Sequence, residues 1–176
     1  MKRLLDYKEM FNYFKKERAK LIQVLEKLSN ETLTENRGLS FDSVKNVFIH
    51  TVMLEDSWLH YRAAGLHSTG LKHEAFEDLK AIRRYIDEVD AKTALLFAKM
   101  TDRDLSREVR RPRPDGNENV YTLEHVLYHI PIEIIHHYGE IFAELWKMDL
   151  EAPYYSYLEY SKNKTEKKNN RVCVKQ

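Results

Sequence analysis

Residues 122–148 read TLEHVLYHIPIEIIHHYGEIFAELWKM, and they carry much of the information about both fold and site. Thr122 is a good N-cap residue, so we predict a helix that begins after it and runs to about residue 148. Apolar residues in this stretch recur at steps of three and four, which is typical of a helix that packs against other helices. They are Leu123, Leu127, Ile130, Ile134, Ile141, Leu145 and Met148.

Three earlier segments show the same helical periodicity. We expect helices over residues 4–28 and 76–100, and another that has Ser40 as its N-cap and ends near Gly65. The segment 76–100 alternates steps of three and four over three heptads, a pattern that fits left-handed bundle packing. With only 5 Gly and 4 Pro in 176 residues, little interrupts these helices. The sequence therefore predicts an all-α four-helix bundle.

The segment before the last helix has a different character. Residues 101–121 contain Pro112, Pro114 and the turn signal Asp115-Gly116 between short alternating stretches. We interpret them as a long connection that can include an edge hairpin, because the prolines exclude a central strand. The chain then divides into one bundle domain over residues 1–160 and a polar, basic C-terminal tail over residues 161–176.

Composition favours a cytoplasmic protein that binds neither nucleic acid nor membranes. The single Cys173 excludes an internal disulfide framework and points to a reducing compartment. The N-terminal residues MKRLLDYKEMFNYF are interrupted by charges, so we expect no signal peptide and no membrane span there. The net charge is +1, and the tail holds the basic excess. The bundle itself is then slightly acidic and lacks the electrostatic footprint of a nucleic-acid-binding protein.

The last predicted helix carries a row of residue types that bind metals. His125, His129, Glu133 and His137 follow one another at steps of four, and His136 adjoins the row. Residues four apart on a helix are neighbours and can hold one ion together. By helical geometry His137 lies at the edge of the apolar stripe and Glu133 one step further out. His129 lies about 120° round, and the other two histidines point to solvent.

A pair of ligands needs a third from another helix to complete a site. His50 is the best candidate, because it lies on the flank of the second helix beside the apolar Val47 and Leu54. Two imidazoles and one carboxylate suit zinc, nickel, manganese or ferrous iron, and they leave coordination positions open for water or substrate. The residue types alone leave open the alternative that these histidines are structural or lie at the surface.

Other polar residues have competing interpretations. Glu55 falls within the apolar stripe of the second helix, where it could orient a ligating imidazole or act as a catalytic general base. Alternatively, it forms a salt bridge with Arg62 or with another helix. His129 could line a cofactor or substrate pocket, or it could be a plain boundary histidine. The histidines that we expect at the surface or in loops are His60, His67 and His73.

Two motifs together resemble the DinB family, a superfamily of DinB/YfiT-like four-helix metal-binding proteins. They are SVKNVFIHTVMLEDSWL, which contains His50, and IEIIHHYGEI in the last helix, and the likeness covers residues 4–148. The resemblance implies an up-down-down-up bundle that is often a homodimer. It also implies a nickel, zinc or similar divalent ion held by one residue of the second helix and two of the fourth. Those positions are His50, Glu133 and His137.

The resemblance also implies a class of chemistry. Activities in the superfamily are mostly transfers or isomerisations with a low-molecular-weight thiol, so we expect a thiol-dependent S-transferase or isomerase that acts on a small molecule. Many relatives have His at the position of Glu133, and the carboxylate version looks like the site of mycothiol-dependent maleylpyruvate isomerase. Because Cys173 lies on the tail, the thiol is expected to be a diffusible cosubstrate. The alternatives are a metal-dependent hydrolase, a metal-binding stress protein without turnover and a helical interaction module.

Overall fold

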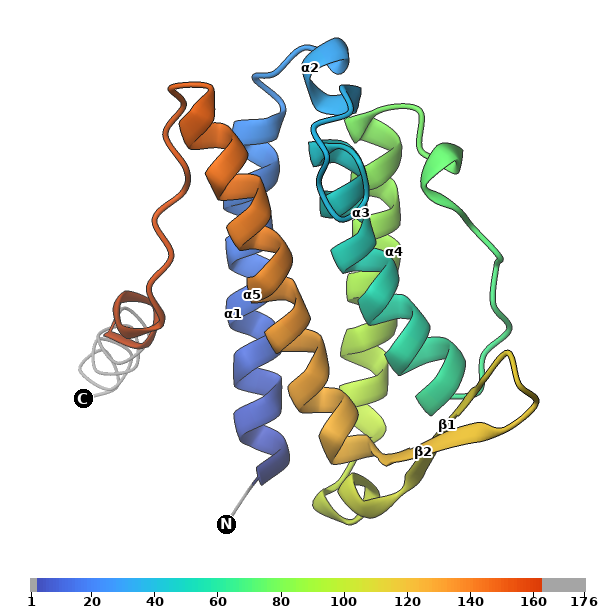
Figure 1. The fold of residues 1–176 in the computed structure, drawn as a ribbon. Helices are drawn as coiled ribbons and strands as arrows, with labels where there is room; N and C mark the ends of the chain where they lie inside the picture. Colours follow the sequence, from blue (N-terminus) through green and yellow to red (C-terminus); the bar gives the residue numbers. More distant parts are fainter. Residues whose placement is uncertain (1–2, 163–176) are drawn as a thin grey trace, which may run out of the picture.

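The structure, a computed structural model, describes residues 3–162 and consists mainly of four long helices (Figure 1). They are α1 (Arg3–Leu25), α3 (Val44–Glu55) with its π-helical continuation η1 (Asp56–Ala63), α4 (Leu79–Lys99) and α5 (Leu123–Lys147). Shorter elements connect them, namely α2 (Asn30–Thr34), η2 (His73–Ala75), η3 (Asp102–Ser106) and the strands β1 (Glu108–Pro112) and β2 (Glu118–Thr122). The prediction of a mainly helical fold is confirmed.

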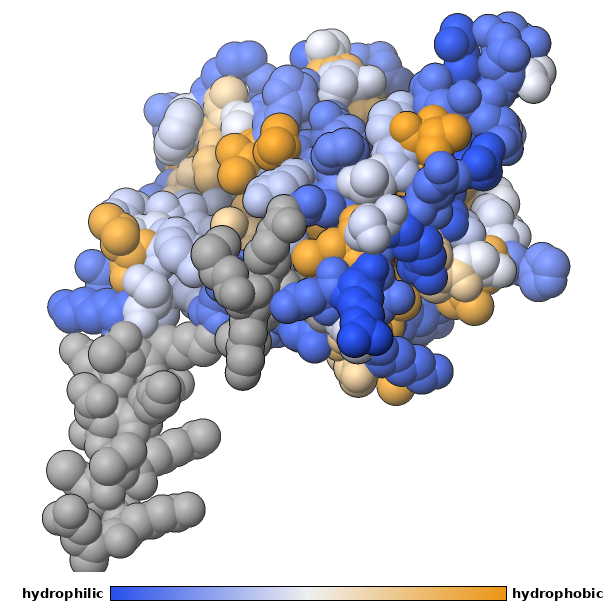
Figure 2. Space-filling model, turned by 90° about the horizontal axis from the view of Figure 1, so that it is seen from below, coloured by the Kyte–Doolittle hydropathy of each residue, from blue (hydrophilic) through white to orange (hydrophobic). Residues whose placement is uncertain are grey.

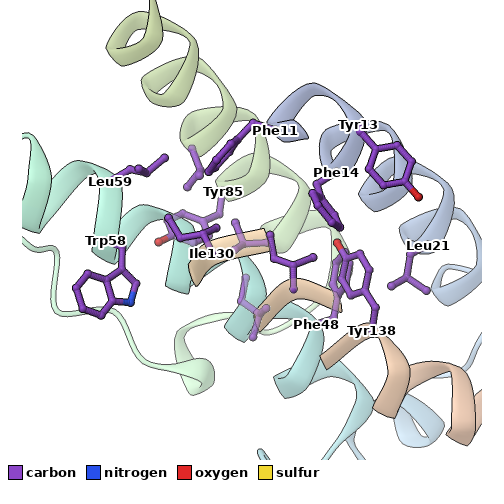
Figure 3. Close-up of a cluster of buried hydrophobic side chains, with 14 of the residues drawn as sticks. Phe11, Tyr13, Phe14, Leu21, Phe48, Trp58, Leu59, Tyr85, Ile130 and Tyr138 are labelled. Atoms are coloured by element: carbon purple, nitrogen blue, oxygen red, sulfur yellow. The ribbon is translucent and has the colours of Figure 1, made fainter. Parts of the chain in front are cut away.

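The long helices share one apolar core. Helix α5 packs against both α1 and α3, and α4 packs against the same two helices. Each helix contributes buried aromatic or branched side chains to the centre, such as Phe14, Phe48, Tyr85 and Ile130 (Figure 3). Burying a side chain of this size contributes about 1.5–3 kcal/mol. The apolar stripe predicted for α5 is buried from Leu123 to Leu145, with Met148 partly buried at its end.

The second long helix begins later than the sequence predicted. Ser43, not Ser40, is the N-cap, and its side chain accepts a hydrogen bond from the Asn46 N–H at 3.3 Å. Asp42 has a φ of 66°, so the chain makes a tight turn just before the helix. Ser40 is thereby left outside the helix, where its hydroxyl donates to the Glu140 carboxylate at 2.7 Å. The predicted end is confirmed, because Gly65 follows η1 with a φ of 70°.

The connection before the last helix folds into a hairpin. Strands β1 and β2 pair in antiparallel register from Glu108↔Thr122 to Pro112↔Glu118, with Gly116 in the turn at a φ of 81°. Thr122 ends the hairpin and caps α5, accepting a hydrogen bond from the His125 N–H at 3.2 Å. Both the edge hairpin and this cap are confirmed. The hairpin contacts η1 and the start of α5, so it stands beside the end of the second long helix.

A buried carboxylate ties η1 to α4. Asp56 is fully buried and accepts hydrogen bonds from His60 Nδ1 and the Tyr61 hydroxyl, both at 2.6 Å. It also accepts from the Tyr85 hydroxyl at 2.8 Å and from Lys92 at 3.2 Å. Burial alone raises the pKa of Asp56, but the hydrogen bonds outweigh it and hold the pKa well below its usual range. His60 is therefore buried, and the prediction of a surface position for it was wrong.

One face of the molecule is mostly hydrophilic (Figure 2). Figure 2 shows one face, on which apolar residues form separate patches among hydrophilic ones. None of the helices within residues 3–162 is long and apolar enough to cross a membrane. Most of the predicted tail, including Cys173, lies outside the described residues.

We expect Asp56→Ala to destabilise the fold strongly, because it leaves three buried or half-buried donors and Lys92 without their acceptor. Loss of one partner in such a network costs about 3–5 kcal/mol in the free energy of unfolding. Urea denaturation measures this value. Asp87→Ala on the exposed face of α4 is the control and should change it by less than about 0.5 kcal/mol. Equal stability of the two variants contradicts the assigned role.

Candidate metal centre

His137 lies at the centre of the candidate site. Its side chain is buried near the middle of α5, at the place that helical geometry predicted. The Glu140 carboxylate lies 2.9 Å from Nδ1 of this ring, and the Ser40 hydroxyl lies 3.4 Å from the same nitrogen. Because a carboxylate only accepts hydrogen bonds, Nδ1 carries the proton and Nε2 keeps a free lone pair. This arrangement orients the imidazole as an outer carboxylate orients a metal-ligating histidine.

Glu140 is held in an ionised state by its neighbours. Partial burial raises the pKa of its carboxyl, but hydrogen bonds from His137 and from both the hydroxyl and the N–H of Ser40 lower it below the usual range. Ser40 comes from the turn before α3, one hundred positions away in the sequence. The hydrogen bond thus joins the entry of the second long helix to α5 and fixes where the His137 ring lies.

The other two predicted ligands lie close to His137. Glu133 Oε2 lies 3.7 Å from His137 Nε2, one helical turn earlier on α5. The His50 ring, from α3, lies 4.9 Å from the His137 ring between centroids, in an edge-to-face arrangement. Glu133 and His50 therefore each lie near His137. His129 continues the row, with Nδ1 at 3.9 Å from Glu133 Oε1.

His50 is held in a partly apolar environment. Its ring stacks on Phe41 with centroids 3.8 Å apart and an interplanar angle of 21°. Burial, together with the positive charge that His137 and His73 can carry, lowers the pKa of His50 to about 4, against a raising effect of Glu140. His50 is therefore neutral near pH 7, which is the state in which an imidazole binds a metal ion.

His73 is a member of the cluster that sequence reasoning missed. Its ring lies 6.0 Å from the His50 ring and 5.2 Å from Phe41, although we predicted a surface or loop position. Its Nε2 is buried and has no hydrogen-bond partner within the described part of the chain. Lys45 anchors this segment to α3 by donating to the Phe76 carbonyl at 2.9 Å. No spacing in the sequence links position 73 to the other histidines, so only the path of the loop reveals it.

A second grouping shares His137. Ligand atoms of His136, His137 and Glu140 lie within 4.8 Å of one another, so these side chains could hold a metal ion. His50 and Glu133 do not belong to that group with their present side-chain conformations. His136 is exposed, as its position on the helical wheel predicted. We call His136, His137 and Glu140 the outer set, and we call the predicted ligands His50, Glu133 and His137 the inner set.

Glu55 lies apart from this cluster. Its carboxylate accepts hydrogen bonds from Arg18 Nη1 at 3.0 Å and from the Thr93 hydroxyl at 2.6 Å. Arg62, the partner considered from the sequence, instead bonds to Ser57. Glu55 is buried between α1, α3 and α4, where an ion pair to another helix satisfies it.

A cleft opens beside the inner set. It has a volume of about 440 Å³, within the size range of small-molecule sites. His129 lies at its wall, with the ring 5.4 Å from that of Trp58 in an edge-to-face contact. A second hollow of about 280 Å³ adjoins it along the hairpin and shares Trp58 and His129 with it. The cleft is lined by His50, Met53, Leu54, Ser57, Trp58, Arg62, His73, Arg111, His129 and Glu133.

Comparison with known proteins shows which family the chain belongs to and which solved structure has a similar fold. The family model described as DinB family matches residues 1–169. Among solved structures, the crystal structure of a DinB-like protein from Bacillus cereus ATCC 10987 is similar, with a TM-score of 0.62. The two chains are 16% identical, and the likeness covers 84% of this chain and 94% of that one, so it shows the fold alone. The comparison with curated proteins gives no significant match.

We expect the His50 imidazole of the metal-free protein to titrate near pH 4, below the ordinary value of 6.5. Between these two values the unfolded chain binds a proton that the folded chain excludes, so this residue lowers stability as the pH falls through that window. Two-dimensional NMR of the imidazole nitrogens measures the midpoint. His67 is exposed and serves as an internal reference. A His50 midpoint at or above 6.5 contradicts its burial against Phe41.

Proposed function

Because the chain belongs to the DinB family, we propose that it is a metal-dependent enzyme that holds one divalent cation with His50, Glu133 and His137. One observation carries the proposal. Nδ1 of His137 is engaged by Glu140 at 2.9 Å, Nε2 lies 3.7 Å from Glu133, and the His50 ring lies 4.9 Å from the His137 ring. Rotations of these side chains would bring their donor atoms to coordination distance from one ion.

The donor set fits a divalent transition metal. Two neutral imidazoles and one carboxylate are a usual catalytic set for zinc, and nickel, manganese and ferrous iron accept the same donors. We favour this inner set over the outer one, because two of its residues line the cleft, whereas His136 is exposed. In addition, Glu140 already serves His137 and Ser40. Nickel and zinc are our leading candidates.

A bound cation supplies positive charge, which lowers the pKa of a thiol or a water beside it. The chain's own residues perform the remaining tasks. Glu140 keeps the proton on Nδ1 of His137, and burial keeps His50 neutral. His129 lies at the cleft wall 3.9 Å from Glu133 and is placed to accept the proton that the nucleophile loses. The cleft holds the small electrophile and shields it from bulk water.

The reaction that we propose is a thiol-dependent S-transfer or isomerisation on a small molecule. The cleft supports this class because it has room for both a thiol and an electrophile next to the histidine cluster. Hydrolysis, in which water replaces the thiol, is the second candidate and uses the same residues. The cytoplasmic location, the homodimer and the up-down-down-up order of the helices belong to the same proposal.

We expect untagged wild-type protein to bind close to one equivalent of nickel or zinc. His137→Ala should abolish stoichiometric binding, and Glu133→Gln or His50→Ala should weaken it at least about 100-fold. Elemental analysis and competition with a chromogenic chelator measure content and affinity.

The adjacent His136→Ala is the matched control, because it removes an exposed imidazole of the outer set only. Binding within about threefold of wild type supports the inner set. Loss of metal in His136→Ala together with retention in Glu133→Gln assigns the ion to the outer set. Absence of metal from the wild-type protein rejects the metal-dependent function.

We expect the metal-loaded protein to accelerate addition of a low-molecular-weight thiol to a small electrophile. Spectrophotometric assays with a panel of thiols and electrophiles measure this rate. Metal-depleted wild type and metal-loaded His129→Gln are the comparison samples, and both should be at least about tenfold slower. If hydrolysis without thiol is the faster reaction, the second candidate is correct. If neither reaction exceeds the protein-free rate, the protein is no enzyme of these classes.

A further inference from the structure

Two arginines from different elements lie beside Trp58 in the wall of the cleft. Arg62 comes from η1 and Arg111 from β1, and both line the cleft. Each guanidinium lies over the ring of Trp58, at 5.0 Å and 5.7 Å from its centroid respectively. Stacking on a ring leaves the N–H donors at the edge of a guanidinium free for a ligand. The hairpin thus contributes a charged wall to the cleft.

Neither arginine is neutralised by a carboxylate within residues 3–162. Two other arginines of the hairpin, by contrast, do have carboxylate partners. Arg110 pairs with Glu108 at 2.6 Å and with Glu118 at 3.1 Å, and Arg113 pairs with Asp115 at 3.0 Å. Side chains alternate between the faces of a strand, so Arg110 and Arg111 point to opposite sides of β1. The acids of the hairpin therefore neutralise its outer arginines and leave the cleft-facing one unpaired.

Arg62 donates to the Ser57 hydroxyl, but neither arginine has a carboxylate partner within residues 3–162, so their like charges repel each other. Partial burial and the neighbouring charge of Arg111 both lower the pKa of Arg62, because each makes its positive charge less favourable. An anion between them relieves the repulsion and accepts hydrogen bonds from both. The planar guanidinium matches a carboxylate or a phosphate in two-point geometry. The two arginines therefore form a candidate anion site, because no carboxylate of the described chain balances their charge.

The remaining lining of the cleft indicates the shape of the ligand. Met53 and Leu54 form an apolar section, and His50 and Glu133 lie in the same cleft with the two arginines. We propose that Arg62 and Arg111 bind the anionic group, a carboxylate or a phosphate, of a small substrate whose reactive part lies at the histidine cluster. This inference rests on the proposed function for the role of the cluster, but the anion site itself stands on the geometry of the arginines.

Anion binding can be measured without any metal. The chain has two tryptophans, so Trp146→Phe leaves Trp58, which touches both guanidiniums, as the single indole reporter. Trp146 is exposed, and its replacement should not disturb the fold. Succinate and inorganic phosphate are titrated into this metal-depleted protein at low ionic strength, with succinamide as the neutral comparison. We expect a saturable change in Trp58 fluorescence with at least one anion and none with succinamide.

Charge-neutral variants test the assignment to residues. In the same background, Arg62→Gln and Arg111→Gln should each weaken anion binding about tenfold, and the double variant should abolish it. Arg110→Gln on the opposite face of β1 is the matched control and should stay within about twofold. Circular dichroism and the melting temperature verify that each variant folds. The anion with the lower Kd shows whether the arginines prefer a carboxylate or a phosphate.

Two results overturn the inference. One is the absence of saturable binding of either anion to the folded parent protein, and the other is equal affinity in the parent and the folded double variant. The outcome is independent of the metal proposal, because the titrations use metal-depleted protein. The double variant should also load nickel or zinc as wild type does, so a failure of metal binding and a failure of anion binding are separate results.

Discussion

The hydrogen bond between His137 and Glu140 is the constraint on which the candidate site depends. An imidazole on a helix can rotate, and either of its nitrogens can carry the proton. Glu140 removes both freedoms, and Ser40 fixes Glu140 from the turn before α3. The entry of the second helix is therefore part of the site, although it contributes no ligand. Because Ser43 and not Ser40 caps α3, the Ser40 hydroxyl is available for this contact.

The buried polar groups of this bundle differ in whether the protein itself satisfies their hydrogen bonds. Asp56 and Glu55 have hydrogen-bond partners on neighbouring helices and are satisfied within the protein. The buried Nε2 of His73 lacks such a partner in the described part of the chain, as do Nε of Arg18 and Nε of Arg37. A folded protein rarely leaves donors and acceptors unpaired, because each costs free energy. Of these three atoms, His73 Nε2 is the one whose residue lines the cleft beside the histidines, where a ligand can complete it.

The sequence predicted the content of α5 well, because a single long helix obeys one simple geometry. The angular order from buried His137 to half-buried Glu133 and exposed His136 follows from 100° per residue alone. Positions that depend on tertiary contacts were not predictable in this way. His60 is buried because its partner Asp56 lies one turn earlier in a π-helical segment that no local pattern announces. Glu55 pairs with Arg18, which lies on a different helix at a distant position in the sequence.

Charge balance connects the candidate metal centre to the arginines. His50 is neutral near pH 7, so in a set with His137 and Glu133 the carboxylate is the one fixed negative charge. A divalent cation there leaves a net positive charge on the cluster, and Arg62 and Arg111 add two more in the same cleft. A histidine at position 133 would make that surplus larger still. In the proposed site Glu133 therefore moderates the positive charge around the cation, while Arg62 and Arg111 make the cleft selective for an anion.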